Sequence, residues 1–143
     1  MRLQSVGVKG ILKCGDKPAA NVRVKLWDED DGPDPDDLLD QGYTDAKGNF
    51  KLQFVPLEKG VDLLENNNLL RLETQGSERE ATNIDPVFKV YHDCDDGIKP
   101  GHRKVKFRIP SSYITNGKIP KRIFDIGVLN LETIFAKEER EFL

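Results

Sequence analysis

The chain has 143 residues, which suits one domain with a single buried core. Its composition, 37% hydrophobic and 33% charged, is typical of a globular protein, and it lacks the run of about 18 apolar residues that would span a bilayer. The net charge of -3 gives no bulk attraction for nucleic acid, so we expect neither an integral membrane protein nor a nucleic-acid binder.

Two β-strands are predicted in the first thirty residues. Apolar and polar side chains alternate from Val6 and again from Val22 to Leu26, and residues 15–18, with Gly and Pro, predict the turn of a hairpin-like beginning. No continuous apolar segment of a secretory signal precedes them, so we expect either a cytosolic protein or one whose signal peptide is not present in this chain. Residues 28–42 contain eight acids, two prolines and two glycines, which predicts a solvated loop.

The later strands are separated by turn signals. Phe50, Leu52 and Phe54 alternate after a predicted tight turn at 45–48. Further strands are predicted at 87–92, 104–109 and 124–131. Residues 55–80 fit either a short helix or a partly apolar loop, and the charged residues 137–143 are expected to fray.

Six or seven short strands with frequent turns and no long helical period predict an all-β sandwich rather than an α/β fold. The residues expected to point inward are Val22, Val24, Leu26, Phe50, Leu52, Phe88, Val90, Val105, Phe107, Ile126, Val128 and Leu129. A shift of one residue in the register would turn each set outward.

The two cysteines, Cys14 and Cys94, allow a single intramolecular pairing. Both lie at the ends of predicted strands, which favours a disulfide. The alternative is two free thiols, one or both of them buried, because two cysteines alone do not define a redox compartment.

Six segments of the chain carry recognisable motifs. They are Gly10 to Cys14, Val22-Arg23-Val24-Lys25-Leu26-Trp27-Asp28-Glu29-Asp30, Tyr43-Thr44-Asp45, Ile84-Asp85-Pro86, Tyr91-His92-Asp93-Cys94 and Phe124-Asp125-Ile126-Gly127-Val128-Leu129-Asn130-Leu131. In this order they resemble the nematode transthyretin-like family, over roughly residues 4–54 and 78–135.

The resemblance implies a transthyretin-like (prealbumin-like) β-sandwich of about seven to eight antiparallel strands, secreted to the extracellular region and closed by a Cys14–Cys94 disulfide. Most members of the family have no assigned activity. One member bridges phosphatidylserine on dying cells to an engulfment receptor, so the resemblance implies a binding role at the cell surface. Hydroxyisourate hydrolases share the fold but need an amino-terminal histidine motif and a carboxy-terminal Tyr-Arg-Gly-Ser motif. This chain has neither motif, so we expect no enzyme and no cofactor.

The chain departs from the family in two places. A second pair of cysteines, common in relatives, is absent, and residues 55–76 resemble an insertion where relatives have a short turn. We expect a single domain at 4–135, followed by a charged tail at 136–143.

Two charged regions are candidates for binding. Alternation puts Lys104, Lys106 and Arg108 on one face of a strand, and a basic stripe of this kind attracts anionic lipid headgroups. The full candidate set for an anionic ligand is Lys99, Arg103, Lys104, Lys106 and Arg108. The alternative is an ordinary solvent-facing strand whose charges prevent edge aggregation.

The acidic loops could supply oxygen ligands to calcium if they met at one end of the sandwich. The candidates are Asp28, Asp30, Asp31, Asp93, Asp95 and Asp96. Their spacing does not match an EF-hand, and a solvated acidic loop explains them equally well, so no metal site is assigned. His92 and His102 show no metal-ligand spacing.

We therefore expect a secreted, non-enzymatic binding or adaptor protein that recognises anionic lipid such as phosphatidylserine, or an extracellular protein receptor. The alternative is a small-molecule carrier or hydrolase that uses a cavity between sheets or subunits. The oligomeric state is left open.

Overall fold

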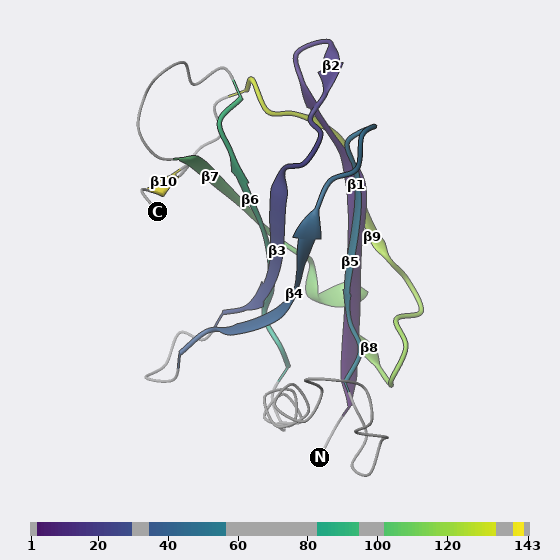
Figure 1. Ribbon diagram of the computed structural model, residues 1–143. Coiled ribbons are helices and arrows are strands. Elements are labelled where there is room, and N and C mark those ends of the chain that lie inside the picture. The colour runs from purple at the N-terminus through teal and green to yellow at the C-terminus, as the bar shows by residue number, and fades with distance from the viewer. Residues whose placement is uncertain (1–2, 30–34, 57–82, 95–101, 134–138, 142–143) are drawn as a thin grey trace, which may run out of the picture.

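The computed structural model describes residues 3–29, 35–56, 83–94, 102–133 and 139–141, without the side chains of 102 and 139–141. Within these ranges the chain forms ten strands and one 3₁₀ helix arranged in two facing sheets (Figure 1). The elements are β1 (Gln4–Cys14), β2 (Lys17–Pro18), β3 (Arg23–Asp28), β4 (Asp37–Tyr43), β5 (Asn49–Phe54), β6 (Pro86–His92), β7 (His102–Arg108), η1 (Ser111–Tyr113), β8 (Thr115–Asn116), β9 (Phe124–Asn130) and β10 (Glu139–Glu141). The all-β sandwich prediction is confirmed.

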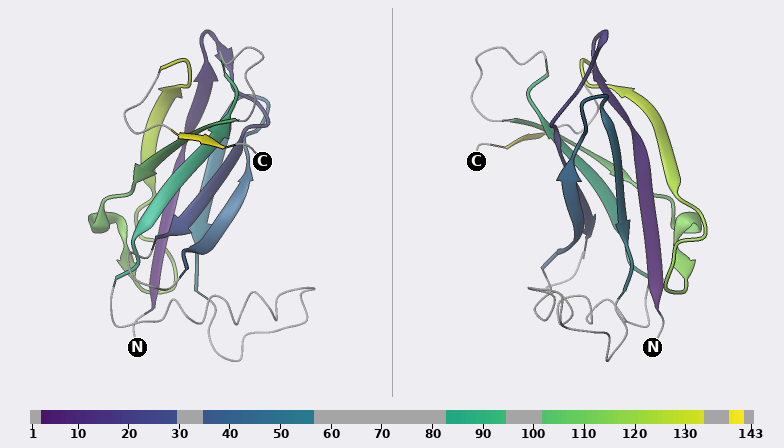
Figure 2. Two further views of the ribbon diagram at one scale, coloured as in Figure 1. Left: turned by 90° about the vertical axis from the view of Figure 1, so that its left-hand side faces the viewer. Right: turned by 45° about the vertical axis from the view of Figure 1, so that its right-hand side comes forward.

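The first sheet is built around the long strand β1. It pairs antiparallel with β2, β5 and β8, and parallel with β9, so the sheet is not purely antiparallel. The second sheet has the strand order β10-β7-β6-β3-β4 with antiparallel pairing throughout. Figure 2 shows the two sheets from two further directions, with β9 at the outer side of the first sheet.

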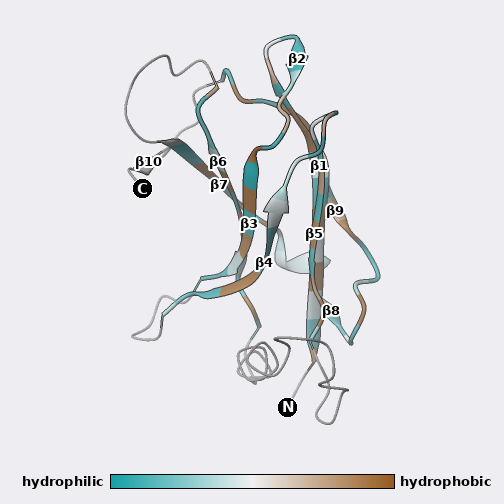
Figure 3. Cartoon of the chain, in the orientation of Figure 1, coloured by the Kyte–Doolittle hydropathy of each residue, from teal (hydrophilic) through white to brown (hydrophobic). Residues whose placement is uncertain are grey.

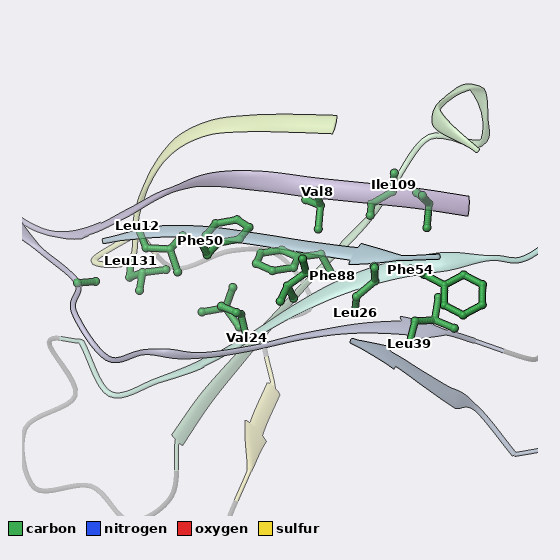
Figure 4. Packing of buried hydrophobic residues seen from close by; sticks show 14 of the residues in the cluster. Val8, Leu12, Val24, Leu26, Leu39, Phe50, Phe54, Phe88, Ile109 and Leu131 are labelled. Carbon is green, nitrogen blue, oxygen red and sulfur yellow. The ribbon is translucent and has the colours of Figure 1, made fainter. Parts of the chain in front are cut away.

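The core lies between the sheets and is filled by large apolar side chains (Figure 4). Phe50 of β5 stacks on Phe88 of β6 with ring centroids 4.6 Å apart. In the second sheet the register aligns Val24 with Val90, and Leu26 with Phe88, so each row places side chains of neighbouring strands in the same layer of the core. Figure 3 shows apolar and polar segments alternating along β3. This alternation lets the strand turn its apolar side chains to the core and its polar side chains outward.

Most of the predicted inward residues are buried or pack against the core, but Val128 is 59% exposed. Its position follows from the register shift between Lys9 and Ile11, where β1 and β9 pair, and from the positive φ of 79° at Gly127. This irregularity turns the side chain of Val128 outward, where it faces Ile11 across the strands.

Two of the local structures predicted for the first half of the chain are wrong. The turn at residues 15–18 joins β1 to the short β2, whereas β3 crosses to the other sheet, so the first two long strands are not hairpin partners. The predicted acidic loop contains strand β4, which pairs with β3 along its length. Burial of Leu39, which is 4% exposed, helps to fix this strand against the core. Residues 30–34 of that loop lie outside the described residues.

The predicted carboxy-terminal tail contains strand β10, which pairs with β7 instead of fraying. The helix-or-loop alternative and most of the expected insertion fall within 57–82, outside the part of the chain that the structure describes. No helix in the described part is long and apolar enough to cross a membrane.

One corner of the sandwich is stabilised by a disulfide and by a buried arginine. The Cys14–Cys94 disulfide joins the end of β1 to the residues that follow β6, and therefore links the two sheets. At the same corner Arg103 is 6% exposed and donates to the carbonyls of Cys94 (2.9 Å), Leu131 (3.1 Å) and Thr133 (2.9 Å). These bonds connect β7 to the segments that follow β6 and β9.

Candidate ligand-binding face

Cationic and aromatic side chains cover the face of β3, β6 and β7 that points away from the core. The strand register arranges them in three rows across the sheet. One row holds Lys104, Tyr91, Arg23 and Tyr43; the next holds Lys106, Lys89 and Lys25; the third holds Arg108, Val87 and Trp27. We call this surface the basic face. Because side chains alternate along a strand, the basic face is the reverse side of the strands whose other residues build the core.

The rings on the basic face contact its cations. The Nζ of Lys25 lies 5.8 Å from the ring centroid of Trp27 and 5.1 Å from that of Tyr91, and the Nζ of Lys89 lies 5.2 Å from Trp27. The guanidinium of Arg23 lies 6.0 Å from the ring of Tyr43. Contacts of this kind attract a cation to the ring face and hold these long side chains in place.

Glu29, directly after β3, brings a carboxylate to one end of the face. Its Oε2 lies 3.2 Å from Lys89 Nζ and 3.6 Å from Lys106 Nζ, and its Oε1 lies 3.3 Å from a guanidinium nitrogen of Arg108. The side chain of Glu29 is only 12% exposed. Asp85 also pairs with Arg108, at 2.8 Å.

The face is hollowed across β3 and β6. A cavity of about 680 Å³ opens there, lined by Arg23, Lys25, Lys89 and Lys104 together with the aromatic rings of Trp27, Tyr43 and Tyr91. Tyr43 is 59% exposed. The cavity therefore combines positive charge with amphipathic rings, a combination that suits an anionic group attached to a larger molecule or surface.

The structure distributes the predicted anion-binding residues over two environments. Lys104, Lys106 and Arg108 align on the basic face, as alternation along the strand indicates. Arg103 points the other way and is buried at the disulfide corner, so it does not belong to an exposed ligand surface. Lys99 lies outside the described residues.

The two calcium candidates that the structure describes, Asp28 and Asp93, lie at opposite ends of β6. Asp28 aligns with Pro86 at the start of β6, whereas Asp93 follows His92 at its end, so the two lie about 20 Å apart along the strand. Asp28 accepts a hydrogen bond from the backbone of Asp85 at 2.8 Å. The other four calcium candidates lie outside the described residues, and the described part of the chain holds no group of three or more His, Cys, Asp or Glu suited to a metal ion.

Sequence reasoning missed the half of the face that β3 and β6 supply. Arg23 and Lys25 alternate with Val24 and Leu26 in the same way as the recognised stripe alternates with its apolar residues. This alternation could have predicted the contribution of β3. The pairing of β3, β6 and β7 in register, which joins their outward residues into one surface, could not be inferred from alternation within single strands.

The described architecture defines a two-sheet β-sandwich with a disulfide between its sheets and a charged outer face. The model of the transthyretin-like family matches residues 9–58 and 71–110. Transthyretin-like protein 46 of Caenorhabditis elegans is 62% identical over 100% of this chain and 68% of its own length, and transthyretin-like protein 33 of the same organism is 45% identical over 98% and 82%. The chain belongs to the transthyretin-like family.

Among solved structures, a 9R-lipoxygenase from Cyanothece superposes on 88% of this chain and 16% of its own, with a TM-score of 0.44 and 23% sequence identity. That likeness is too weak to bear on the fold or the function.

Proposed function

We propose that this protein is a secreted, non-enzymatic binding module, an adaptor that uses its basic face to recognise anionic phospholipid headgroups such as phosphatidylserine at a cell surface. The observation that carries the proposal is the convergence of Arg23, Lys25, Lys89 and Lys104 on one hollow of the outer face. Cationic residues near an anionic membrane each contribute about 1 kcal/mol of attraction, so several on one face are sufficient for salt-dependent binding.

The aromatic side chains of the face support a membrane ligand. Tyr and Trp rings are favoured at the boundary between water and lipid, where one end of the ring is apolar and the other polar. Tyr43 is well exposed beside Arg23, and Trp27 lies between two lysines.

Secretion is supported by the disulfide, since such bonds persist in oxidising compartments. The proposal that the protein is not an enzyme is supported by the names of its relatives. They are called transthyretin-like proteins, and neither name states a reaction. A carrier that encloses a small molecule between its sheets is disfavoured, because Phe50 and Phe88 stack in that space.

The test is co-sedimentation of the oxidised protein with vesicles of phosphatidylcholine alone or with added phosphatidylserine, at low and at physiological salt. The variant carries Lys104→Glu, Lys106→Glu and Arg108→Glu. The control carries Lys9→Glu and Lys51→Glu, which face each other on exposed positions of the opposite sheet. Circular dichroism checks that both variants are folded.

We expect binding that requires phosphatidylserine, weakens with salt, is lost in the β7 variant and persists in the control. Absence of binding to anionic vesicles at low salt would refute the lipid proposal and direct the search to a protein receptor. Equal loss in both variants would show that net charge, and not the basic face, governs the association.

A further inference from the structure

The connection between β8 and β9, residues 117–123, carries the most exposed large apolar side chain in the described part of the chain. We call this connection the β8–β9 loop. Ile119 in it is 71% exposed. The sequence from residue 110 to residue 124 contains no acid, and its cations lie on both sides of Ile119; they are Lys118, Lys121 and Arg122. A single apolar residue on a surface is ordinary, but an apolar tip between cations matches the chemistry of an anionic membrane surface.

Hydrogen bonds hold the β8–β9 loop against the first sheet. The N–H of Gly117 donates to the carbonyl of Leu3 at 2.8 Å, and the N–H of Lys121 donates to Oγ1 of Thr115 at 2.9 Å. Thr115 is itself 8% exposed, so the second bond ends in the buried part of the sandwich. A loop that is already held in shape loses little conformational entropy when it binds, which favours association.

A small hollow opens beside this loop. Its volume is about 300 Å³, and Lys121 and Arg122 line it together with hydroxyl and amide side chains that include Ser112 and Asn116. The guanidinium of Arg122 lies 4.4 Å from the ring centroid of Tyr113 and donates to the carbonyl of Ser112 at 3.3 Å. Two cations with neutral hydrogen-bond donors suit a compact anion such as a lipid phosphate.

The β8–β9 loop and the basic face point in different directions. Strands β8 and β9 pair with β1 in the first sheet, whereas the basic face is the outer side of the second sheet. Figure 1 shows the loop at the lower right, beyond β1, with β6 and β7 on the left, and the right-hand view of Figure 2 also places it on the side of the first sheet. A flat membrane that covers the basic face therefore does not reach the loop.

We propose that the β8–β9 loop is a second membrane contact, in which Ile119 enters the apolar edge of a bilayer while Lys121 and Arg122 contact lipid phosphates. The ligand is a phospholipid bilayer and not a soluble anion, because an apolar tip gains free energy only where it leaves water. The inference rests on the proposed function, which supplies the first contact through the basic face. Because the two contacts face apart, one molecule joins two bilayers and clusters anionic vesicles.

Two measurements on the same samples separate the contacts. Co-sedimentation with phosphatidylserine vesicles reports the first contact, and light scattering reports clustering, which needs both. The loop variant carries Ile119→Gln and Lys121→Gln. The control carries Val128→Gln and Lys51→Gln, which remove one exposed apolar side chain and one exposed lysine from the outer side of the same sheet.

We expect the loop variant to sediment within about twofold of the wild type, since the larger set of cations on the basic face is intact. It should need about 30-fold more protein for half-maximal clustering, because apolar burial and one charge are lost from the second contact. The control should sediment and cluster as the wild type does. The β7 variant should lose both.

A dye at residue 119 reports insertion directly. Both cysteines of the chain form the disulfide, so Ile119→Cys supplies a single thiol for an environment-sensitive label such as nitrobenzoxadiazole. Its fluorescence should rise with phosphatidylserine vesicles and not with phosphatidylcholine alone. The same label at Val128→Cys should not respond. At high lipid concentration, the label at residue 119 should also respond in the β7 variant.

The outcomes distinguish this inference from the proposed function. Sedimentation of the wild type without clustering, or clustering by the loop variant at wild-type concentrations, would refute the second contact and leave the basic face standing. A response of the dye at residue 119 without sedimentation of the wild type would refute the basic face and leave the loop standing. Equal loss of clustering in the control would overturn the role of the loop. Urea unfolding of each variant identifies any loss that comes from the fold.

Discussion

Arg103 gives the sharpest stability prediction. Its guanidinium donates three hydrogen bonds to backbone carbonyls, and the side chain is 6% exposed. In Arg103→Met the carbonyls of Cys94 and Leu131, which belong to buried residues, lose this donor, whereas that of the exposed Thr133 can bind water. An unsatisfied buried acceptor costs about 1–3 kcal/mol, so the two together cost about 4 kcal/mol.

The assay is urea unfolding of the oxidised protein at pH 7, followed by circular dichroism, with the free energy obtained by linear extrapolation. A loss of about 4 kcal/mol is a large fraction of the stability of an ordinary domain. Arg103→Lys should recover part of it, because an ammonium group keeps the charge but cannot reach three carbonyls in one plane.

Arg122→Met is the control, since Arg122 is exposed and its guanidinium makes one 3.3 Å contact to the carbonyl of Ser112 and lies 4.4 Å from the ring centroid of Tyr113. It should change stability by no more than about 1 kcal/mol. A loss below about 1 kcal/mol in Arg103→Met, with an unchanged denaturant slope, would refute the role assigned to this side chain.

Removing the Cys14–Cys94 disulfide, which spans 80 positions, should lower stability by about 4 kcal/mol; urea midpoints with and without reductant check this. The backbone hydrogen bond from Asn49 holds the pKa of Asp45 below its ordinary value, so its carboxylate stabilises the fold above about pH 4. That stabilisation is lost as pH falls through the lower folded-state pKa, and the difference in urea midpoint between wild type and Asp45→Asn should shrink there. Gly48→Ala should cost about 2 kcal/mol in urea unfolding, because φ is +83° and the new Cβ would meet the carbonyl oxygen of Leu12. Val128→Thr should change stability by less than about 0.5 kcal/mol in the same assay, and a larger loss would place this side chain in the core.

The sequence predicted the sandwich because the second sheet follows a simple alternation. Apolar residues recur at every second position of β3 and β6, as the two-residue period of a strand requires. They are Val24, Leu26, Phe88 and Val90, and all four are buried. Prediction failed where the backbone departs from that period. The irregular pairing of β9 with β1 turned Val128 outward, and local alternation holds no information about such a shift.

Composition misled in the acidic segment. Asp37 and Asp40 made residues 37–43 resemble a loop, yet Leu39 is buried and the strand pairs with β3. Asp40 has a structural use at this edge, since its carboxylate accepts the backbone N–H of Gln53 on β5 at 2.9 Å. This hydrogen bond joins strands of the two different sheets. It could not be predicted from the sequence, because the local pattern does not show which strands of the two sheets lie side by side.

The candidate site was predicted in part for the same reason. Alternation put Lys104, Lys106 and Arg108 on one face correctly. It could not show that Arg103 would be buried at the disulfide corner, or that Glu29 would reach across the sheet to two of the three. Both results depend on contacts between segments distant in the chain.

The parallel pairing of β1 with β9 has a consequence for how the chain folds. Val8 pairs with Phe124, and Lys13 with Asn130, so the central strand of the first sheet gains one neighbour only from the far end of the sequence. Pairings over such long separations close slowly, because the entropy of a large loop is lost before any contact compensates for it. During synthesis, the edge of β1 that pairs with β9 therefore stays unpaired until the residues of β9, from 124 onward, have left the ribosome. Protection of the β1 amides against hydrogen exchange should accordingly appear late in refolding.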